Sequence, residues 1–135
     1  VADHVDALHA HHADGDAPPA ARAAAVHDLI RARETELLAP LMDWLRGRND
    51  VRLLGPSDPE RRAPTMSLVH ERPGEELADA LLAHRIGAGG GCFYSDRCVA
   101  AQGVAVDHGV LRLSFLHYTS EDEVARLMEA LDRVL

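Results

Sequence analysis

An arginine stands in the middle of a short apolar segment near the end of the 135-residue chain. Arg112 and Ser114 alternate with the apolar residues of the segment 110–115, and this period of two predicts a strand with one polar face. A lone guanidinium is costly to bury, whereas its planar fork matches a carboxylate. Arg112 is therefore a candidate for binding a small carboxylate. The alternative is a structural ion pair with an Asp or Glu of the same chain.

A second candidate is the glycine-rich segment 87–94, which carries Cys92 and Tyr94. Glycines permit close approach of the backbone to a ligand. The segment does not have the spacing of a dinucleotide-binding fingerprint that opens a helix, so it is weak evidence for nucleotide binding. Cys92 is either a reactive thiol or a passive one in a loop. Cys98 falls on the apolar side of a predicted short helix, where a core position is expected.

Histidines supply the remaining candidates. His117 follows the arginine strand and could reach the same cleft, or it is a hydrogen-bonded structural residue. His9 and His12 have a helical spacing that could share a divalent ion. No acidic or cysteine ligand accompanies them at a recognised spacing, so no functional metal site is expected. The sequence also has no nucleophile elbow, P-loop or CxxC pair.

Composition narrows the class of protein. The formal net charge of −8 argues against general nucleic-acid binding, and no apolar run is long enough to predict a membrane-spanning helix. Two cysteines are too few for a disulfide framework, so a reduced, cytoplasmic location is expected. Every one of the 14 basic side chains counted as Lys or Arg is an arginine, and the chain has no lysine.

The helices and strands that position these residues are predicted from hydrophobic periodicity and from residues typical of helix ends and turns. Ser120 and Glu123 form a predicted capping box, followed by an apolar helical stripe. Pro40 predicts a kink or a break in the longest helix. The segment 86–95 should begin as a strand and become a loop. The expected helices are 1–13, 20–47, 73–85, 96–104 and 120–135, and the expected strands are 51–55, 65–71, the start of 86–95 and 110–115.

This order of elements predicts an α+β fold, with a small, mostly antiparallel sheet covered on one face by helices. Residues 1–19 would form an N-terminal helix and loop, and residues 20–135 the domain itself.

Three stretches carry a resemblance to a known family: RLLGPSDPERRAPTMSLV, ADALLAHRIGAGGGCFYSDRCVAAQGV and LRLSFLHYTSEDEVARLMEALDRV. Together they resemble the C-terminal end of class V aminotransferases, the pyridoxal-phosphate (PLP) enzymes that include cysteine desulfurases. The similarity is greatest to the cysteine desulfurase-like branch and covers roughly residues 25–135. It implies the fold of the small C-terminal domain of fold-type I PLP-dependent transferases.

The resemblance also implies roles for single residues. Arg112 stands where the family's arginine binds the substrate α-carboxylate. Tyr94 stands where cysteine desulfurases carry the persulfide-forming cysteine, and Cys92 lies two residues earlier. The arginine and histidine that precede that cysteine in the family are replaced by Gly89 and by Gly91 with Cys92.

Taken together, these features predict a fragment or isolated small domain of a PLP-dependent, cysteine desulfurase-like enzyme that acts on amino acids and closes its active site. The family holds PLP on a lysine. This lysine-free chain, which begins at Val1, is therefore expected to be inactive alone and to lack a large PLP-binding domain. The parent would be a homodimer with a small amino-acid substrate, and that large domain would decide between desulfuration, transamination and elimination. The alternative is a stand-alone, non-catalytic binding or interaction module derived from such a domain.

Overall fold

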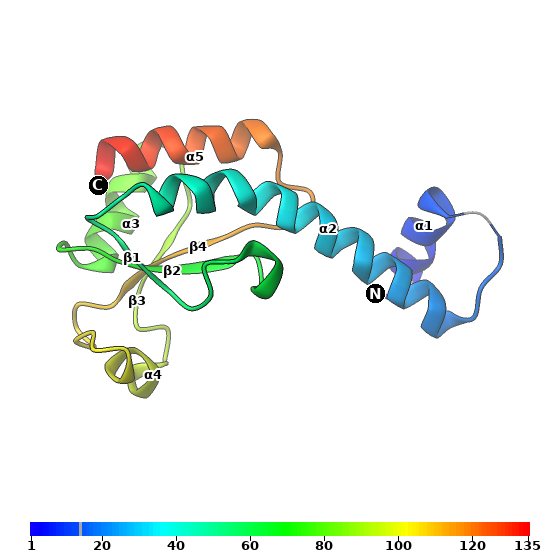
Figure 1. The fold of residues 1–135 in the computed structure, drawn as a ribbon, viewed down its shortest axis with the longest axis horizontal. Coiled ribbons are helices and arrows are strands. Elements are labelled where there is room, and N and C mark those ends of the chain that lie inside the picture. The colour runs from blue at the N-terminus through cyan, green and yellow to red at the C-terminus, as the bar shows by residue number, and fades with distance from the viewer. Residues whose placement is uncertain (14) are drawn as a thin grey trace.

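Five α-helices, four short strands and one 3-10 helix form the described part of the chain, residues 1–13 and 15–135 of a computed structural model (Figure 1). The elements are α1 (Ala2–His12), α2 (Pro19–Arg46), β1 (Arg52–Leu54), η1 (Pro59–Arg61), β2 (Thr65–Val69), α3 (Gly74–Ala83), β3 (Gly89–Gly91), α4 (Asp96–Ala101), β4 (Val110–Ser114) and α5 (Glu121–Val134).

The strands form one antiparallel sheet in the order β1-β2-β4-β3. Helices α2, α3 and α5 lie on one side of the sheet, and the short helix α4 lies on the other (Figure 1). The predicted α+β class and the helix-covered antiparallel sheet are therefore confirmed.

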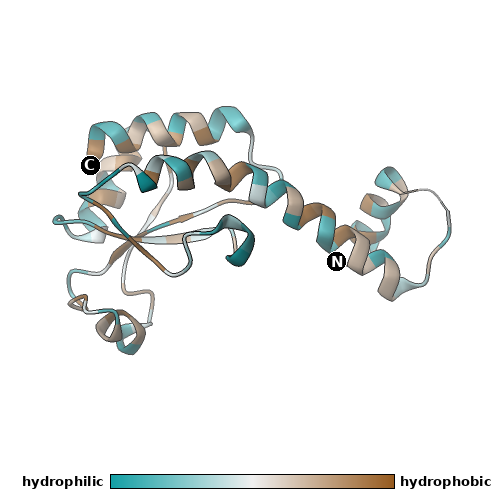
Figure 2. Cartoon of the chain, in the orientation of Figure 1, coloured by the Kyte–Doolittle hydropathy of each residue, from teal (hydrophilic) through white to brown (hydrophobic). Residues whose placement is uncertain are grey.

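The core lies between the sheet and the three helices α2, α3 and α5. Alternate residues of β2 and β4 point into it, and the residues between them face the opposite side, as a period of two requires. Figure 2 shows hydrophobic residues on the crossing strands and hydrophilic residues around η1 and at the start of α5. The most deeply buried core side chains are Leu37, Leu38, Leu41, Met42, Met66, Leu68, Leu77, Leu81, Leu111 and Leu131.

Helix α2 runs without a break through Pro40, so of the two predicted alternatives, a kink or a break, the break is wrong. Pro40 itself is exposed, whereas Leu38 before it and Leu41 after it are buried in the core. Packing of both flanks against the sheet and α5 holds the helix together across the one backbone hydrogen bond that proline cannot make.

The glycines form strand β3, so the prediction of a strand that ends before them is wrong. The reason is close packing against α3. A Cβ on Gly90 would collide with the Cα of Glu75 and the carbonyl oxygen of Gly74. Only glycine allows the strand and the helix to approach this closely.

The N-terminal half of α2 extends beyond the sheet, and α1 packs against it (Figure 1). An ion pair joins Arg22 Nε to Asp6 Oδ1 at 2.7 Å. His9 is the buried residue of α1, whereas Val1 and His12 at its two ends are exposed.

The capping box of α5 is confirmed. The Ser120 Oγ accepts from the Glu123 backbone N–H at 3.2 Å, and the Ser120 backbone N–H donates to Glu123 Oε2 at 2.8 Å. Among the helices of the described residues, none combines the length and apolarity needed to cross a bilayer.

Candidate functional site

The face of the sheet opposite the helices is polar at its centre. Arg112 of β4 lies directly across from Ser67 of β2, and Ser114 lies across from Thr65. The Thr65 hydroxyl donates to the Ser114 hydroxyl at 3.2 Å. The alternation seen in the sequence therefore places Arg112 on this polar face and Leu111 and Leu113 in the core.

A loop and α4 stand over part of this face. The chain leaves β3, turns at Cys92, where the Ser95 backbone N–H donates to the Cys92 carbonyl at 2.9 Å, and enters α4. The Arg52 guanidinium of β1 donates twice, at 3.1 Å each, to the Gln102 carbonyl at the end of α4. The Ser95 bond closes the turn that leads into α4, and the Arg52 bonds tie the end of α4 to the sheet.

A pocket of about 360 Å³ lies between the polar face, this loop and α4. Its walls carry hydroxyls, two thiols and two arginines, and none of the described residues that line it is an Asp or Glu. A site of this composition favours an anion. The lining residues are Leu54, Gly55, Arg62, Thr65, Ser67, Cys92, Phe93, Ser95, Cys98, Val99, Gln102, Val110 and Arg112.

Arg112 has its charge available in this pocket. Its side chain is exposed, and within the described residues no carboxylate lies within ion-pair distance of it. The intramolecular ion pair considered as an alternative is therefore not found in this part of the chain. The guanidinium instead stacks on Phe93, with Cζ 4.0 Å from the ring centroid, a cation–π contact.

Arg62, the second arginine of the pocket, is a structural residue. Its guanidinium donates to the carbonyls of Pro56 at 2.6 Å and Thr65 at 2.9 Å, and its Nε is buried without a partner among the described residues. Burial lowers the pKa of the Arg62 guanidinium from its ordinary value. These bonds connect the loop around η1 to β2.

The structure brings only some of the predicted site residues together in the pocket of Arg112. Cys92 is half-buried and lines the pocket beside Arg112. Tyr94 is fully exposed, at 106% relative accessibility, and does not line it. His117 lies elsewhere: it lines a separate apolar pocket with Leu8 and His12 of the N-terminal segment.

Cys98 is exposed and faces the pocket, so its predicted core position is wrong. Val99, the next residue, is the buried member of α4. A six-residue helix over a polar face has only a narrow buried side, and the sequence pattern did not indicate which residue would occupy it.

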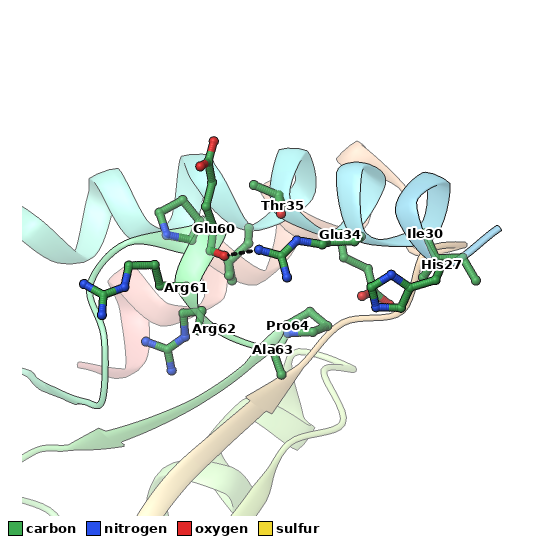
Figure 3. Close-up of a pocket in the computed structure, with 12 residues that line it drawn as sticks. His27, Ile30, Glu34, Thr35, Glu60, Arg61, Arg62, Ala63 and Pro64 are labelled. Atoms are coloured by element: carbon green, nitrogen blue, oxygen red, sulfur yellow. Dashed lines mark hydrogen bonds between the residues drawn. The ribbon is translucent and has the colours of Figure 1, made fainter. Parts of the chain in front are cut away.

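A larger pocket, about 670 Å³, lies between α2 and the η1 loop (Figure 3). It also contains arginines, but Arg31 donates to the Glu60 carbonyl, and the side chains of Arg61 and Arg62 point away from His27 at its other end (Figure 3). Glu34 and Glu60 line it as well. Its charges do not converge on one point, so the pocket of Arg112 is the better candidate for binding an anion.

Sequence reasoning missed most of the residues that line this pocket, among them Phe93 and Ser67. Ser67 could have been found from the strand register, since it alternates with the core residues Met66 and Leu68. No local pattern indicated that the Phe93 ring would lie beneath Arg112.

Comparison with known proteins agrees with the fold and shows the family. The family model described as aminotransferase class-V matches residues 23–127. An aminotransferase-like protein, FGM3, from Gibberella zeae is 30% identical over 112 residues, which is 80% of this chain and 28% of that protein.

Two solved cysteine desulfurases share the fold. The apo enzyme from Thermococcus onnurineus NA1 has a TM-score of 0.71 at 22% identity, over 85% of this chain and 29% of that one. CsdA from Escherichia coli has a TM-score of 0.65 at 19% identity, over 90% of this chain and 32% of that one. The chain thus spans less than a third of the length of each of these relatives.

Proposed function

Since the chain belongs to the class V aminotransferase family, we propose that it works as the small domain, residues 20–135, of a larger enzyme that acts on amino acids. In this role it supplies Arg112 to the substrate α-carboxylate and covers the active site of a large domain. The short share of each relative that the chain spans supports a partner domain elsewhere in the protein.

The guanidinium of Arg112, which has no ion-pair partner among the described residues, is the observation that carries the proposal. It lies on the polar face of the sheet, in a pocket without a lining carboxylate among the described residues. An arginine in this setting binds a carboxylate through two parallel N–H bonds, which orient the substrate as well as hold it. Ser67, directly opposite Arg112, offers a further hydroxyl donor.

The cofactor of the family does not fit this chain alone. PLP enzymes hold PLP as a Schiff base to a lysine, and the 135 residues contain no lysine. The attachment of PLP, and the chemistry that PLP supplies, therefore belong to other parts of the proposed enzyme. This chain contributes substrate binding, orientation and exclusion of water.

The loop beside Arg112 bears on one feature of the reaction, which is whether a thiol of this chain takes part in it. Cys92 lines the pocket, whereas Tyr94, which the family resemblance places at the position of the persulfide-forming cysteine, is exposed and does not line it. Desulfuration through Cys92 and a reaction without a protein thiol both remain within the proposal. Replacement of Cys92 by Ser separates them, because only the first would lose activity.

Arg112→Gln in the intact protein that carries this chain tests the proposal. The substitution keeps a polar side chain but removes the charge and the fork. We expect KM for the amino-acid substrate to rise at least about tenfold, the effect of losing a charge-assisted hydrogen bond.

Arg97→Gln is the matched control, because Arg97 is an exposed arginine of α4 that does not line the pocket. Equal kinetics for the two variants would refute the proposal.

A further inference from the structure

Within the described residues, Arg112 contacts an aromatic ring and makes no ion pair. The Cζ atom lies 4.0 Å from the centroid of Phe93. An exposed arginine without such a contact populates many rotamers and loses that freedom when it binds a ligand. A ring stacked on one face of the guanidinium restricts its plane while the N–H donors stay at the edge, where a carboxylate can reach them.

The ring fits because Gly89 has no side chain. Gly89 of β3 is the register partner of Arg112 in β4. A Cβ on Gly89 would lie 2.8 Å from both Cε1 and Cζ of Phe93, and 3.9 Å from Nε of Arg112. The missing Cβ therefore leaves a slot beside Arg112 that the Phe93 ring occupies.

The loop that carries the ring has an uncommon backbone. Phe93 and Tyr94 both adopt left-handed conformations, with φ of 54° and 58°. Consecutive non-glycine residues in this region are sterically unfavourable and persist only where their surroundings hold them. Here the Ser95 backbone N–H bonds to the Cys92 carbonyl at 2.9 Å, and the Ser95 hydroxyl donates to the Phe93 carbonyl at 3.3 Å. The backbone thus turns the Phe93 ring toward the sheet and the Tyr94 ring toward solvent.

We propose that Phe93, seated in the slot left by Gly89, is a positioning residue that sets the plane of the Arg112 guanidinium for a substrate carboxylate. The inference rests on the proposed function, because it assigns Phe93 a role through Arg112. It adds that binding depends on a ring that itself need not touch the substrate.

Two variants remove the ring from beneath Arg112 by different routes. Phe93→Leu keeps an apolar side chain without a π face. Gly89→Ala leaves Phe93 in place but displaces its ring, which is the far end of a flexible side chain. Gly87→Ala is the matched control, because a Cβ there meets nothing within 4 Å. Phe93→Tyr keeps the ring and should behave as the unmodified chain.

The first readout is the NMR signal of the Arg112 Nε–H in this chain, assigned by its loss in Arg112→Gln. A stacked ring shifts this signal upfield. We expect Phe93→Leu and Gly89→Ala to move it back toward the position of an exposed arginine, and Gly87→Ala and Phe93→Tyr to leave it in place. An unchanged signal in both ring-removing variants would overturn the inference.

The second readout is kinetic, in the intact protein that carries the chain. We expect Phe93→Leu and Gly89→Ala to raise KM for the amino-acid substrate about three- to tenfold, more than they lower kcat. Urea unfolding of each variant identifies any loss that comes from folding.

If Arg112→Gln raises KM but Phe93→Leu and Gly89→Ala do not, the positioning role of Phe93 is refuted and the proposed function stands. If Arg112→Gln behaves like Arg97→Gln, the proposed function fails and the inference fails with it.

Discussion

Gly90 of β3 lies so close to Glu75 of α3 that a Cβ on the glycine would come within 2.5 Å of the Glu75 backbone nitrogen. This approach seats α3 on the edge of the sheet and holds β3 beside β4. The strand that supplies the slot for Phe93 therefore depends on a packing contact on the opposite side of the sheet.

We predict that Gly90→Ala destabilises the chain by about 1–3 kcal/mol or more, the usual cost of overpacking, because its new Cβ meets backbone that cannot move cheaply. Gly87→Ala should be neutral or slightly stabilising, since its Cβ has open space and alanine lowers the entropy of the unfolded chain. Urea unfolding followed by circular dichroism measures both. Equal midpoints would show that β3 and α3 are not packed as described.

Arg112→Lys should weaken substrate binding in the intact protein although it keeps the positive charge. Lysine presents a point charge and cannot make two parallel bonds to one carboxylate. We expect KM to rise about tenfold, the loss of one charge-assisted hydrogen bond. Arg97→Lys, on exposed α4, is the control and should leave KM unchanged. If Arg112→Lys had the same KM as the unmodified protein, the two parallel hydrogen bonds of the guanidinium would not contribute to substrate binding.

The capping box should make the stability of α5 dependent on pH. Hydrogen bonds from the Ser120 backbone and then from its side chain lower the pKa of Glu123. A carboxylate with a lowered folded-state pKa stabilises the fold above its ordinary pKa and loses that contribution as the pH falls through the folded-state value.

Glu123→Gln therefore should be less stable than the unmodified chain at pH 7, with the difference shrinking as the pH falls from about 5 toward 3. Glutamine still accepts a hydrogen bond, so the variant isolates the charge. Glu129→Gln, an exposed position on the same helix, is the control. Urea unfolding at several pH values measures the difference, and one that stays constant with pH would contradict the assignment.

The absence of lysine predicts the behaviour of this chain with PLP. After incubation and borohydride reduction, mass spectrometry should find no adduct on any side chain, because the only primary amine is at the N-terminus. Arg97→Lys gives the chain one exposed lysine and should show the adduct that proves the chemistry worked. If the unmodified chain kept one equivalent of PLP through desalting, the proposal that PLP is held by other parts of the enzyme would be contradicted.

The residues of β4 and α5 could be predicted from the sequence because their signals are local. The polar face of β4 follows from alternation over five residues, and α5 follows from a capping box and a repeating apolar stripe. Both patterns state which side of an element faces the core, and burial of that side is the main driving force for folding. One of the three stretches that carry the family resemblance covers these two elements, so part of the resemblance rests on the same local patterns.

The tertiary structure alone decided which side chains meet at Arg112. The meeting of Arg112, Gly89 and Phe93 depends on the pairing of β3 with β4 and on a loop that returns over the sheet. His117 follows Arg112 by five residues, yet it lies against the N-terminal helices. Local propensity sets the period of an element, whereas strand register and packing between distant segments set its neighbours. The sequence by itself therefore determined Arg112 as the candidate ligand-binding residue, and only the packing of β3, β4 and the loop determined what holds it in place.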